Sequence, residues 1–578
     1  MFLVADTATA DSAYAAAALQ KKLGRIPGYS PKKKRTVQSD SSARSLASKE
    51  AALALLENPQ QSLHSLKLSL SSKYGITFLK NSEILRFIPK GPASASSSSL
   101  RTSPKRIAAV RALLLKSPTR TLSGISPVAL MPLPALCGGH CTYCPRGEGA
   151  PQAYTGYEPT TMRAIQNGYS ASRQITARLK QYAAQGHTVD KCHLIIMGGT
   201  FLYSGIKESY RHAFMKEAFD TLNGKKSATL RDAIDLNEFA PHRAIGVTYE
   251  TRPDYGFEYH ADEMLSTAGT QVELGVQALS DRVYEKVRRG HSVADVIRST
   301  RILKDSGFKL CYHMMPGLFS TPKQDVSYFK RLFTSQDFQP DMLKIYPTLV
   351  VQGTVLYKQW KRGEFTPYDT EAAAEVIAQA TRYIPPYVRT PRIQRDIPSP
   401  LISAGVMNSN LRQIVDAKLK EMGKKCRCIR CREIGSSERR GHPTRKLSLS
   451  LQRTDYSASG GKEIFLSFED AKKDLLAGFL RLRIPGVSHR SEISSDSGIL
   501  SSIVRELHVY GQEAAIGEDS QTKMQHKGLG KQLLAEAEEI TKKEFGLGKI
   551  TVISGPGVRG YYRKHGYSLD GPYMSKKV

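Results

Sequence analysis

The sequence contains no run of 18 consecutive apolar residues, the shortest stretch expected of a membrane-spanning helix. It also has no basic, apolar leader, because residues 1–20 are rich in alanine but include Asp6 and Asp11 and no lysine or arginine. These absences predict that no segment spans a membrane, and they argue against a secretory signal peptide. We therefore expect a cytoplasmic protein.

Acidic residues are scarce relative to basic ones, with 53 Asp and Glu against 84 Lys and Arg and a formal net charge of +31. The excess is concentrated in residues 1–120 and 411–453. Lys and Arg that neutralise phosphates release counterions, so nucleic acid is the expected partner class. Plain solubilising charge is the simpler alternative. The basic run at residues 31–35 fits either a nuclear-import patch or a nonspecific tail.

Cysteine is also scarce, at eight residues in 578, and six of the eight fall in two short clusters. This grouping predicts metal ligands in a reducing compartment and excludes a disulfide framework. The two remaining cysteines, Cys192 and Cys311, lie in apolar runs and are predicted to be buried without a chemical role.

The first cluster, Cys137, Cys141 and Cys144, has C-x3-C-x2-C spacing. Three thiolates this close can bind three irons of a [4Fe-4S] cluster and leave the fourth iron open to another ligand. A structural zinc site would need four protein ligands, with His140 as the fourth. We favour the iron-sulfur cluster.

The second cluster, Cys426, Cys428 and Cys431, lies within the basic region 411–453. A C-x-C-x2-C triplet suits a structural zinc site whose fourth ligand comes from elsewhere, and His442 is the nearest in sequence. Surface thiols without metal are the alternative.

Composition divides the chain into five parts. Residues 1–65 lack periodicity and are predicted to be a disordered basic tail. Residues 66–120 show helical spacing on both sides of a serine-rich linker, residues 92–99, and form a basic helical arm. An α/β domain over 121–400, a cysteine-rich linker over 401–455 and an α+β domain over 456–578 follow.

Residues 121–400 alternate β-branched runs with amphipathic segments, which predicts a parallel sheet, open or closed into a barrel. The expected strands are Cys192–Met197, Ala244–Glu250, Gln271–Gln277, Phe308–Met315 and Met342–Tyr346. Glycines, polar residues and one methionine end these strands: Gly198, Gly199, Thr200, Glu250, Gln277, His313, Met315 and Tyr346. Because the carboxyl ends of parallel strands share one rim, these residues predict a site there, although each alone could be an ordinary turn.

The last domain contains Gln525, Gly528 and Gly530 in a Q-x-x-G-x-G turn that leads into an amphipathic helix. A glycine-rich turn before a helix presents backbone N–H groups to a pyrophosphate, which favours coenzyme A binding. Near the end of the chain, Tyr561 is one of several phenols that could donate a proton to a leaving thiolate.

From about Leu66 to Val578 the chain resembles the Elongator catalytic subunit family. Besides the first cysteine cluster and the glycine turns, the resemblance rests on residues 153–164, 248–255, 394–398, 505–511 and 561–564. The three-residue gap between Cys137 and Cys141 departs from the family, whose members have a longer gap.

The resemblance implies a partial radical S-adenosylmethionine (SAM) barrel fused to a GNAT acetyltransferase domain that together form 5-carboxymethyluridine at the wobble position of tRNA. Cys137, Cys141 and Cys144 would hold the cluster, and the open iron would bind SAM. The residues implied to line the SAM and substrate cleft are Gly198, Gly199, Thr200, Glu250 and Gln277. Those implied to contact acetyl-coenzyme A are Lys191, Glu506, Leu507, His508, Val509, Gln525, Gly528, Leu529, Gly530, Lys531 and Tyr561. Lys191 and Tyr561 are the implied catalytic residues.

The implied nucleic-acid partner is the tRNA anticodon stem-loop, gripped by the two basic regions. Accessory subunits or a second copy of the chain could assist. Two other hypotheses remain at this point. A protein lysine acetyltransferase would use only the C-terminal domain and would not need the cysteines. An RNA-binding scaffold with degenerate sites would need neither cofactor.

Overall fold

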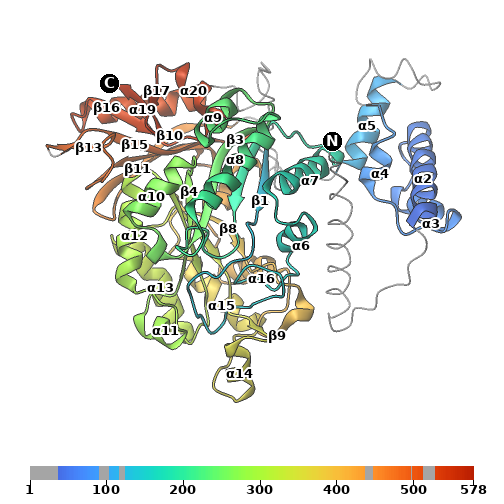
Figure 1. Ribbon diagram of the computed structural model, residues 1–578, viewed down its shortest axis with the longest axis horizontal. Coiled ribbons are helices and arrows are strands. Elements are labelled where there is room, and N and C mark those ends of the chain that lie inside the picture. The colour runs from blue at the N-terminus through green and yellow to red at the C-terminus, as the bar shows by residue number, and fades with distance from the viewer. Residues whose placement is uncertain (1–36, 90–102, 116–123, 436–446, 496, 512–527) are drawn as a thin grey trace, which may run out of the picture.

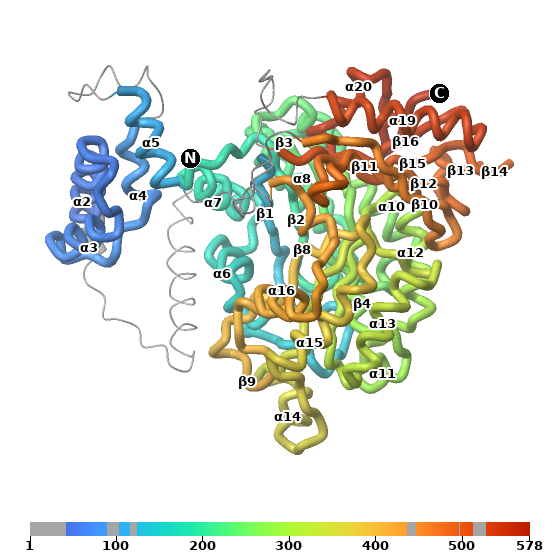
Figure 2. Tube along the Cα trace, turned by 180° about the vertical axis from the view of Figure 1, so that it is seen from behind, coloured from blue at the N-terminus to red at the C-terminus, as the bar shows by residue number. Residues whose placement is uncertain are grey.

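The computed structural model describes residues 37–89, 103–115, 124–435, 447–495, 497–511 and 528–578. Three parts are visible in Figures 1 and 2: a helical arm at the N-terminus, a central α/β body, and a mixed sheet against one end of that body. The predicted serine-rich linker, most of the Q-x-x-G-x-G turn including Gln525, and His442 lie outside the described residues.

In the described part of the arm, four helices pack around their own small apolar core. They are α2 (Val37–Glu57), α3 (Leu63–Lys73), α4 (Asn81–Leu85) and α5 (Pro104–Leu114). The prediction of a disordered tail over residues 1–65 is therefore wrong for its second half. Ala47, Ala51 and Leu55 are fully buried at a spacing of four residues, which is one face of a helix. Their small size hid this face in a segment rich in serine and alanine.

The central body is built on a seven-stranded parallel sheet whose spatial order, β1-β2-β3-β4-β5-β6-β8, follows the chain. Its strands are β1 (Ile125–Leu130), β2 (Lys191–Ile196), β3 (Arg243–Thr251), β4 (Gln271–Gln277), β5 (Lys309–Met314), β6 (Met342–Ile345) and β8 (Arg389–Ile393). β1 and β8 are not paired with each other, so the sheet is a curled half-barrel with two edges. The expected partial barrel is confirmed.

Helices cover the outer face of this sheet (Figure 1). They are α6 (Pro159–Gln166), α7 (Ala171–Ala184), α8 (Glu208–Asn223), α9 (Leu230–Leu236), α10 (Glu258–Ser266), α11 (Asp281–Lys286), α12 (Val293–Asp305), α13 (Pro322–Thr334), α15 (Thr370–Thr381) and α16 (Leu411–Glu421). α14 (Val355–Lys361) projects from the body, and α17 (Ile429–Arg432) follows α16. Leu310, Tyr312 and Met314 alternate along β5 as buried core residues beneath these helices.

The C-terminal part is an α+β unit with strand order β10-β11-β12-β15-β16-β18-β17. Its strands are β10 (Ser450–Ala458), β11 (Gly461–Asp470), β12 (Leu475–Ile484), β15 (Ser502–Val509), β16 (Lys549–Val552), β17 (Ser568–Asp570) and β18 (Tyr573–Lys577), with helices α19 (Leu529–Lys543) and α20 (Arg559–Arg563). β15 and β16 are parallel and pair only through Ser502–Val504. The second half of β15 therefore separates from β16.

One face of this second sheet packs on the amino ends of the barrel strands through buried charges. Arg505 donates to Asp341 (2.6 Å) and to Glu463 (2.8 Å), and all three side chains are at most 1% exposed. Asp341 immediately precedes β6, so this contact lies opposite the carboxyl ends of the strands. The buried ion pairs fix how the two sheets meet, because a charge left unpaired there would be costly.

Candidate functional sites

The first cysteine cluster lies on a loop that follows β1 and crosses the carboxyl end of the half-barrel. The Cys137 N–H donates to Gln152 Oε1 (3.1 Å), and the Gln152 amide donates to the Gly139 carbonyl (2.8 Å). Farther along, the Thr142 N–H donates to the Val287 carbonyl (3.0 Å), and the Thr142 carbonyl accepts from the Leu356 N–H (2.8 Å). These hydrogen bonds help to hold the loop in place.

The two glycines between the first cysteines lie close to neighbouring side chains. Gly138 has φ +68°, and a Cβ on Gly139 would lie 2.3 Å from Arg252 Nη1 and 3.4 Å from Cys137 Sγ. No side chain fits at Gly139 without moving this arginine. The short gap between Cys137 and Cys141 is thus matched to an arginine packed against the loop.

Two buried arginines give the cysteine loop a positive environment. Arg289 Nη1 lies 3.5 Å from Cys141 Sγ, and Arg252 is ion-paired with Asp254 (2.8 Å). Burial by itself would raise the pKa of Cys141, but Arg289 and Arg252 together bring it below the usual value. Burial and the neighbouring thiols raise the pKa of Cys144 to about 12. The site therefore favours one thiolate before metal binds.

The two cysteine clusters differ in how close their sulfur atoms lie to one another. Among the described residues, Cys426, Cys428 and Cys431 bring their sulfur atoms within 4.8 Å of one another, whereas Cys137, Cys141 and Cys144 do not form such a group. Thiolates on one tetrahedral zinc lie about 3.8 Å apart, given Zn–S bonds of about 2.3 Å. The second cluster therefore fits a single zinc ion, and the wider first cluster fits the larger [4Fe-4S] core.

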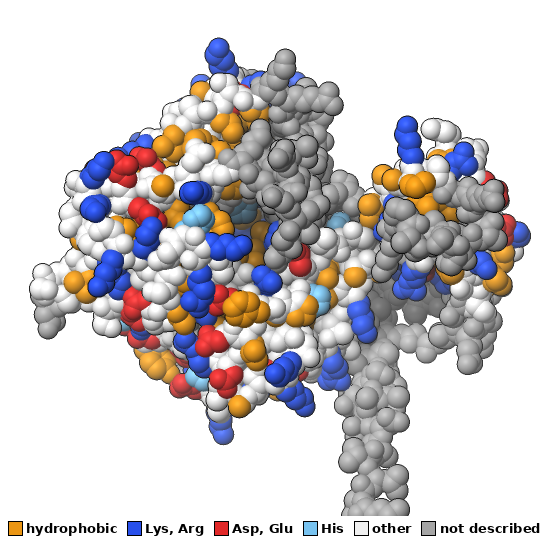
Figure 3. Space-filling view, turned by 90° about the horizontal axis from the view of Figure 1, so that it is seen from above, with side chains coloured by type: hydrophobic (Ala, Val, Ile, Leu, Met, Phe, Trp, Pro, Cys, Tyr) orange, Lys and Arg blue, Asp and Glu red, His pale blue; other side chains and the backbone are white. Residues whose placement is uncertain are grey.

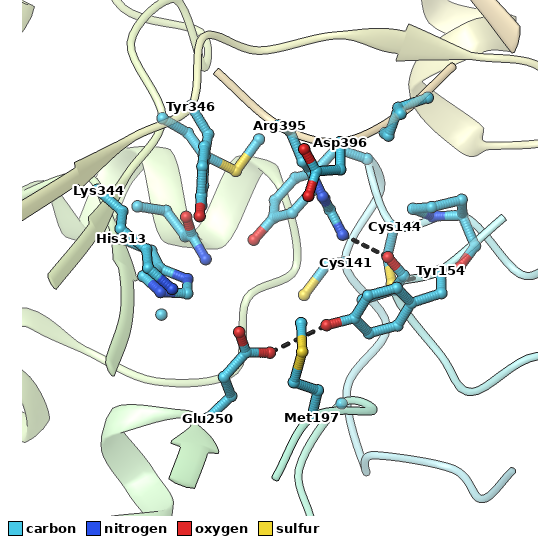
Figure 4. A pocket seen from close by; sticks show the side chains of 18 of the residues that line it. Cys141, Cys144, Tyr154, Met197, Glu250, His313, Lys344, Tyr346, Arg395 and Asp396 are labelled. Atoms are coloured by element: carbon cyan, nitrogen blue, oxygen red, sulfur yellow. Dashed lines mark hydrogen bonds between the residues drawn. The ribbon is translucent and has the colours of Figure 1, made fainter. Parts of the chain in front are cut away.

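The first cluster opens into a cavity of about 190 Å³ inside the half-barrel (Figure 4). Gly199, Thr200, Glu250 and Gln277 line it together with Cys137, Cys141 and Cys144, and so do His313, Met315 and Tyr346. The structure thus brings together the strand-end residues that the sequence placed on one rim. Gly198 lies beside the cavity against Pro132 and Pro151.

Individual positions in the cavity have the geometry of a binding site. Gly198 and Gly199 have φ values of +118° and +92°, which a side chain would strain. Glu250 accepts a hydrogen bond from the Tyr154 hydroxyl (2.9 Å). Gln277 has φ +70°, and its buried Oε1 has no hydrogen-bond partner among the described residues. An unpaired buried acceptor on the wall of a cavity is suited to a ligand N–H or O–H.

Sequence reasoning missed several charged residues of the cavity, namely Glu273, Arg289, Lys344 and Arg392, and it gave Arg252 and Arg395 no separate role there. A signal for two of them was present. Glu273 lies in Gln271–Gln277, where polar and apolar residues alternate, and Lys344 interrupts an apolar strand. A parallel sheet with two apolar faces reads as a continuous hydrophobic run, so such polar positions indicate a polar lumen.

The expected acetyl-coenzyme A residues lie at the other end of the barrel, on the C-terminal sheet. Glu506, Leu507, His508 and Val509 form the half of β15 that has no pairing with β16. Gly528, Leu529, Gly530 and Lys531 form the start of α19, with Gly528 at φ +73°. Tyr561 on α20 is 38% exposed, and its hydroxyl would lie 2.9 Å from a Cβ on Gly530. The opened strand, the helix start and the phenol therefore share one region.

Two side chains of β15 point toward the barrel and not toward α19. Glu506 is ion-paired with Arg481 (3.0 Å) and with Lys309 (3.8 Å) at the start of β5. Burial lowers the pKa of His508 to about 4, and its Nε2 has no partner among the described residues. Lys191 begins β2 at this same end of the barrel. Figure 3, which views this end, shows basic side chains spread over the face and not gathered in one patch.

The second cysteine cluster is a closed site. Cys428 is fully buried, Arg412 Nη2 lies 3.4 Å from Cys431 Sγ, and the Ile429 N–H donates to the Val388 carbonyl next to β8 (2.9 Å). Hydrogen bonds from Cys426 and Cys431 lower the pKa of Cys428 well below its usual value. The described cavity residues include none of these three cysteines, so this cluster has the character of a structural site.

Within the part of the chain that the structure describes, no helix combines the length and the apolar character needed to cross a membrane.

Comparison with known proteins matches both halves of the central body to family models. Residues 131–332 match the Radical SAM superfamily, and residues 340–421 match the Radical_SAM C-terminal domain. The chain is 47% identical over 475 residues to the tRNA uridine(34) acetyltransferase of Methanocaldococcus infernus, covering 81% of this chain and 88% of that protein.

Eukaryotic relatives match over similar lengths. Elongator complex protein 3 of Schizosaccharomyces pombe is 42% identical over 550 residues (92% of this chain, 98% of that protein), and the Homo sapiens protein is 44% identical over 478 residues (80% and 86%). The solved structure of the archaeal Methanocaldococcus infernus Elp3, which lacks N-terminal residues 1–46, superimposes with a TM-score of 0.70 at 44% identity and covers 79% of this chain and all of that one.

Proposed function

The chain belongs to the family of Elongator complex protein 3 and the tRNA uridine(34) acetyltransferases, and from this premise we propose that it forms 5-carboxymethyluridine at the wobble uridine of tRNA. The observation that carries the proposal is the placement of two sites on one half-barrel. The cysteine cavity lies at the carboxyl ends of the strands, and the opened strand β15 lies at their amino ends.

The cavity residues fit a [4Fe-4S] cluster with SAM. Three thiols face the cavity beside Arg289, and the sulfur spacing exceeds that of a single-metal site. When bound, this pair of cofactors supplies a carbon-centred radical that abstracts hydrogen. Gly199 and Thr200 would approach the SAM backbone closely, Glu250 and Gln277 would take its polar groups, and the buried cavity would keep water from the radical.

The C-terminal domain fits the acetyl donor as a GNAT-type unit. The backbone of Glu506–Val509 that is not paired with β16 would pair with the pantetheine amides. The N–H groups of Gly528, Leu529, Gly530 and Lys531 would receive the pyrophosphate. Tyr561 would protonate the departing thiolate, and Lys191 would contact the donor from the barrel.

Three features support tRNA as the substrate. The arm α2–α5 presents exposed Lys49, Lys80, Lys105 and Arg106, and the region around the second cysteine cluster is strongly basic. Arg392, near the end of β8, and Arg395, just after it, also line the cavity, where a phosphate next to the wobble base could bind.

Anaerobic incubation of the iron-loaded protein with tRNA, reductant, SAM and acetyl-coenzyme A tests this function. We expect a carboxymethyl mass gain on the wobble uridine that disappears when either SAM or acetyl-coenzyme A is left out. Acetylation of a lysine peptide without any change in the tRNA would instead support the lysine acetyltransferase hypothesis. An unchanged tRNA and an unchanged peptide would support the scaffold hypothesis.

A further inference from the structure

The lumen of the half-barrel carries a buried charge cluster. His313 Nε2 lies 2.7 Å from a carboxylate oxygen of Glu273, and the Lys344 ammonium donates to the same oxygen. Their side chains are 14%, 5% and 16% exposed, in the order His313, Glu273 and Lys344. Closed eight-stranded (β/α) barrels are usually filled by branched apolar residues. Because a buried ion pair is seldom worth more than an apolar replacement, stability does not explain this cluster.

The cluster forms the floor of the cavity. Glu273 lies four residues before Gln277, which ends β4, so it sits deeper than the residues expected to hold SAM. Figure 4 shows Lys344 and His313 across the cavity from Cys144 and Tyr154. A group bound at Lys344 would therefore face the cysteine loop.

Charged residues lie between the floor and the C-terminal domain. Burial lowers the pKa of His193 to about 4, and the charges that act on it are Lys309, Glu273, Glu506 and Lys344. Lys309 in turn is ion-paired with Glu506 on β15. Charged groups thus extend from the opened strand, where the acetyl donor is expected, to the floor of the radical cavity.

A metal ion is the main alternative for this cluster. Ligand atoms of Glu273, Cys311 and His313 lie within 4.8 Å of one another. However, the Lys344 ammonium already neutralises the Glu273 carboxylate, and a second cation beside it would be repelled. The chain thus provides a fixed cation of its own at this position.

We propose that Lys344 binds the carbonyl oxygen of the acetyl thioester and presents its methyl group to the radical, an inference that rests on the proposed function. Glu273 and His313 hold the ammonium in place. In the step concerned, one C–H bond of the methyl group breaks and one C–H bond forms on the 5′ carbon derived from SAM. The unpaired electron left on the acetyl carbon is shared with the carbonyl oxygen, and the ammonium hydrogen bond stabilises that oxygen.

Infrared spectroscopy tests the contact without any turnover. The probe is [1-13C]acetyl-coenzyme A bound to the iron-loaded protein without SAM. We expect the carbonyl stretch to move to lower frequency in the wild type and in Lys344→Arg, and to return toward its value in water in Lys344→Met. The same frequency in the wild type and in Lys344→Met would overturn the inference.

Isotope transfer tests the consequence in the loaded enzyme. With CD3-labelled acetyl-coenzyme A, we expect the deuterated fraction of the 5′-deoxyadenosine to fall at least fivefold in Lys344→Met and in the double variant Glu273→Gln/Lys344→Met. The double variant avoids an unpaired buried carboxylate. Because the readout is a fraction, a general loss of folded protein does not change it.

The matched control is Arg211→Met, which breaks the buried pair of Arg211 and Glu263 (2.7 Å) between α8 and α10, away from the cavity. Its deuterated fraction should equal that of the wild type. An equal fall in this variant, or an unchanged fraction in both Lys344→Met variants, overturns the inference and leaves the proposed function standing. No deuterium transfer in the wild type overturns both.

Discussion

The two cysteine triplets have nearly the same spacing in sequence but opposite surroundings. Cys137, Cys141 and Cys144 face a cavity, lie beside Arg289 and Arg252, and keep their sulfur atoms apart. Cys426, Cys428 and Cys431 bring their sulfur atoms together beside Arg412, in a partly buried turn tied to Val388, the residue before β8. A metal site that reacts must keep one position open, whereas a site that stabilises is closed. The surroundings of each triplet, and not its spacing alone, decide whether it is suited to a reactive cluster or to a stabilising metal.

Removing one thiol from the open site should have the largest effect. Cys141→Ala deletes a ligand of the proposed cluster, and we expect modification of tRNA to fall by well over the roughly 100-fold loss typical of outer-shell changes. The loss is measured from the mass of the modified tRNA and from the amount of iron bound to the protein. Cys192→Ala, at a buried cysteine outside both triplets, should keep its iron. Retained activity in Cys141→Ala would contradict the radical site.

Adding a methyl group to the loop between the first two cysteines should displace Arg252 and so weaken the binding of the cluster. Gly139→Ala places a Cβ 2.3 Å from Arg252 Nη1, so we expect about 10- to 100-fold weaker cluster retention. Gly548→Ala is the matched control, because nothing lies within 4 Å of its Cβ. Iron content after gel filtration measures both. Equal iron in the two variants would show that the loop tolerates displacement.

Removing a thiol from the second cysteine cluster should lower the thermal stability of the protein and leave the iron site unchanged. Cys428→Ala removes a buried thiol of the proposed zinc site, and we expect Tm to fall by about 10 °C because the metal stabilises only the folded chain. The iron content should remain that of the wild type. Loss of iron along with zinc would mean that the two triplets are not independent sites.

The smallest expected effect is a difference in reactivity between the thiols of Cys141 and Cys144 in the metal-free chain. The pKa of Cys141 lies below its usual value and that of Cys144 is raised to about 12. At pH 7 Cys141 therefore has the larger thiolate fraction, and we expect iodoacetamide to modify it first. Cys428 also has a lowered pKa but is fully buried, so it should react only on unfolding. Peptide mass spectrometry would reveal any reversal of this order.

The fold could be predicted from the sequence except at its edges. All five expected strands of the barrel are present, but β1 and β8 were missed. Each contains a proline, Pro127 in β1 and Pro391 in β8, and proline within a short run argues against a central strand. Both are edge strands of the sheet, which is where proline is tolerated. The sequence does not show whether a strand lies at the edge or in the centre of a sheet, and for this reason β1 and β8 were missed.

The site was predictable where residues lie at strand ends and not where they lie inside the barrel. Gly199, Glu250 and Gln277 follow from the end of each strand, and the structure brings them into one cavity. Arg289 comes from a turn after α11, and its approach to Cys141 depends on tertiary packing. The buried charges between the two sheets, such as Arg505 with Asp341, are 164 residues apart in the chain. Contacts at that separation leave no local pattern.

Electron paramagnetic resonance of the reduced protein tests the open site most directly. The account predicts a [4Fe-4S]+ signal whose g values shift when SAM is added, because the fourth iron is free to bind it. The signal should persist in Cys428→Ala and vanish in Cys141→Ala. A signal that does not respond to SAM, or zinc in place of iron at Cys137, Cys141 and Cys144, would contradict the account.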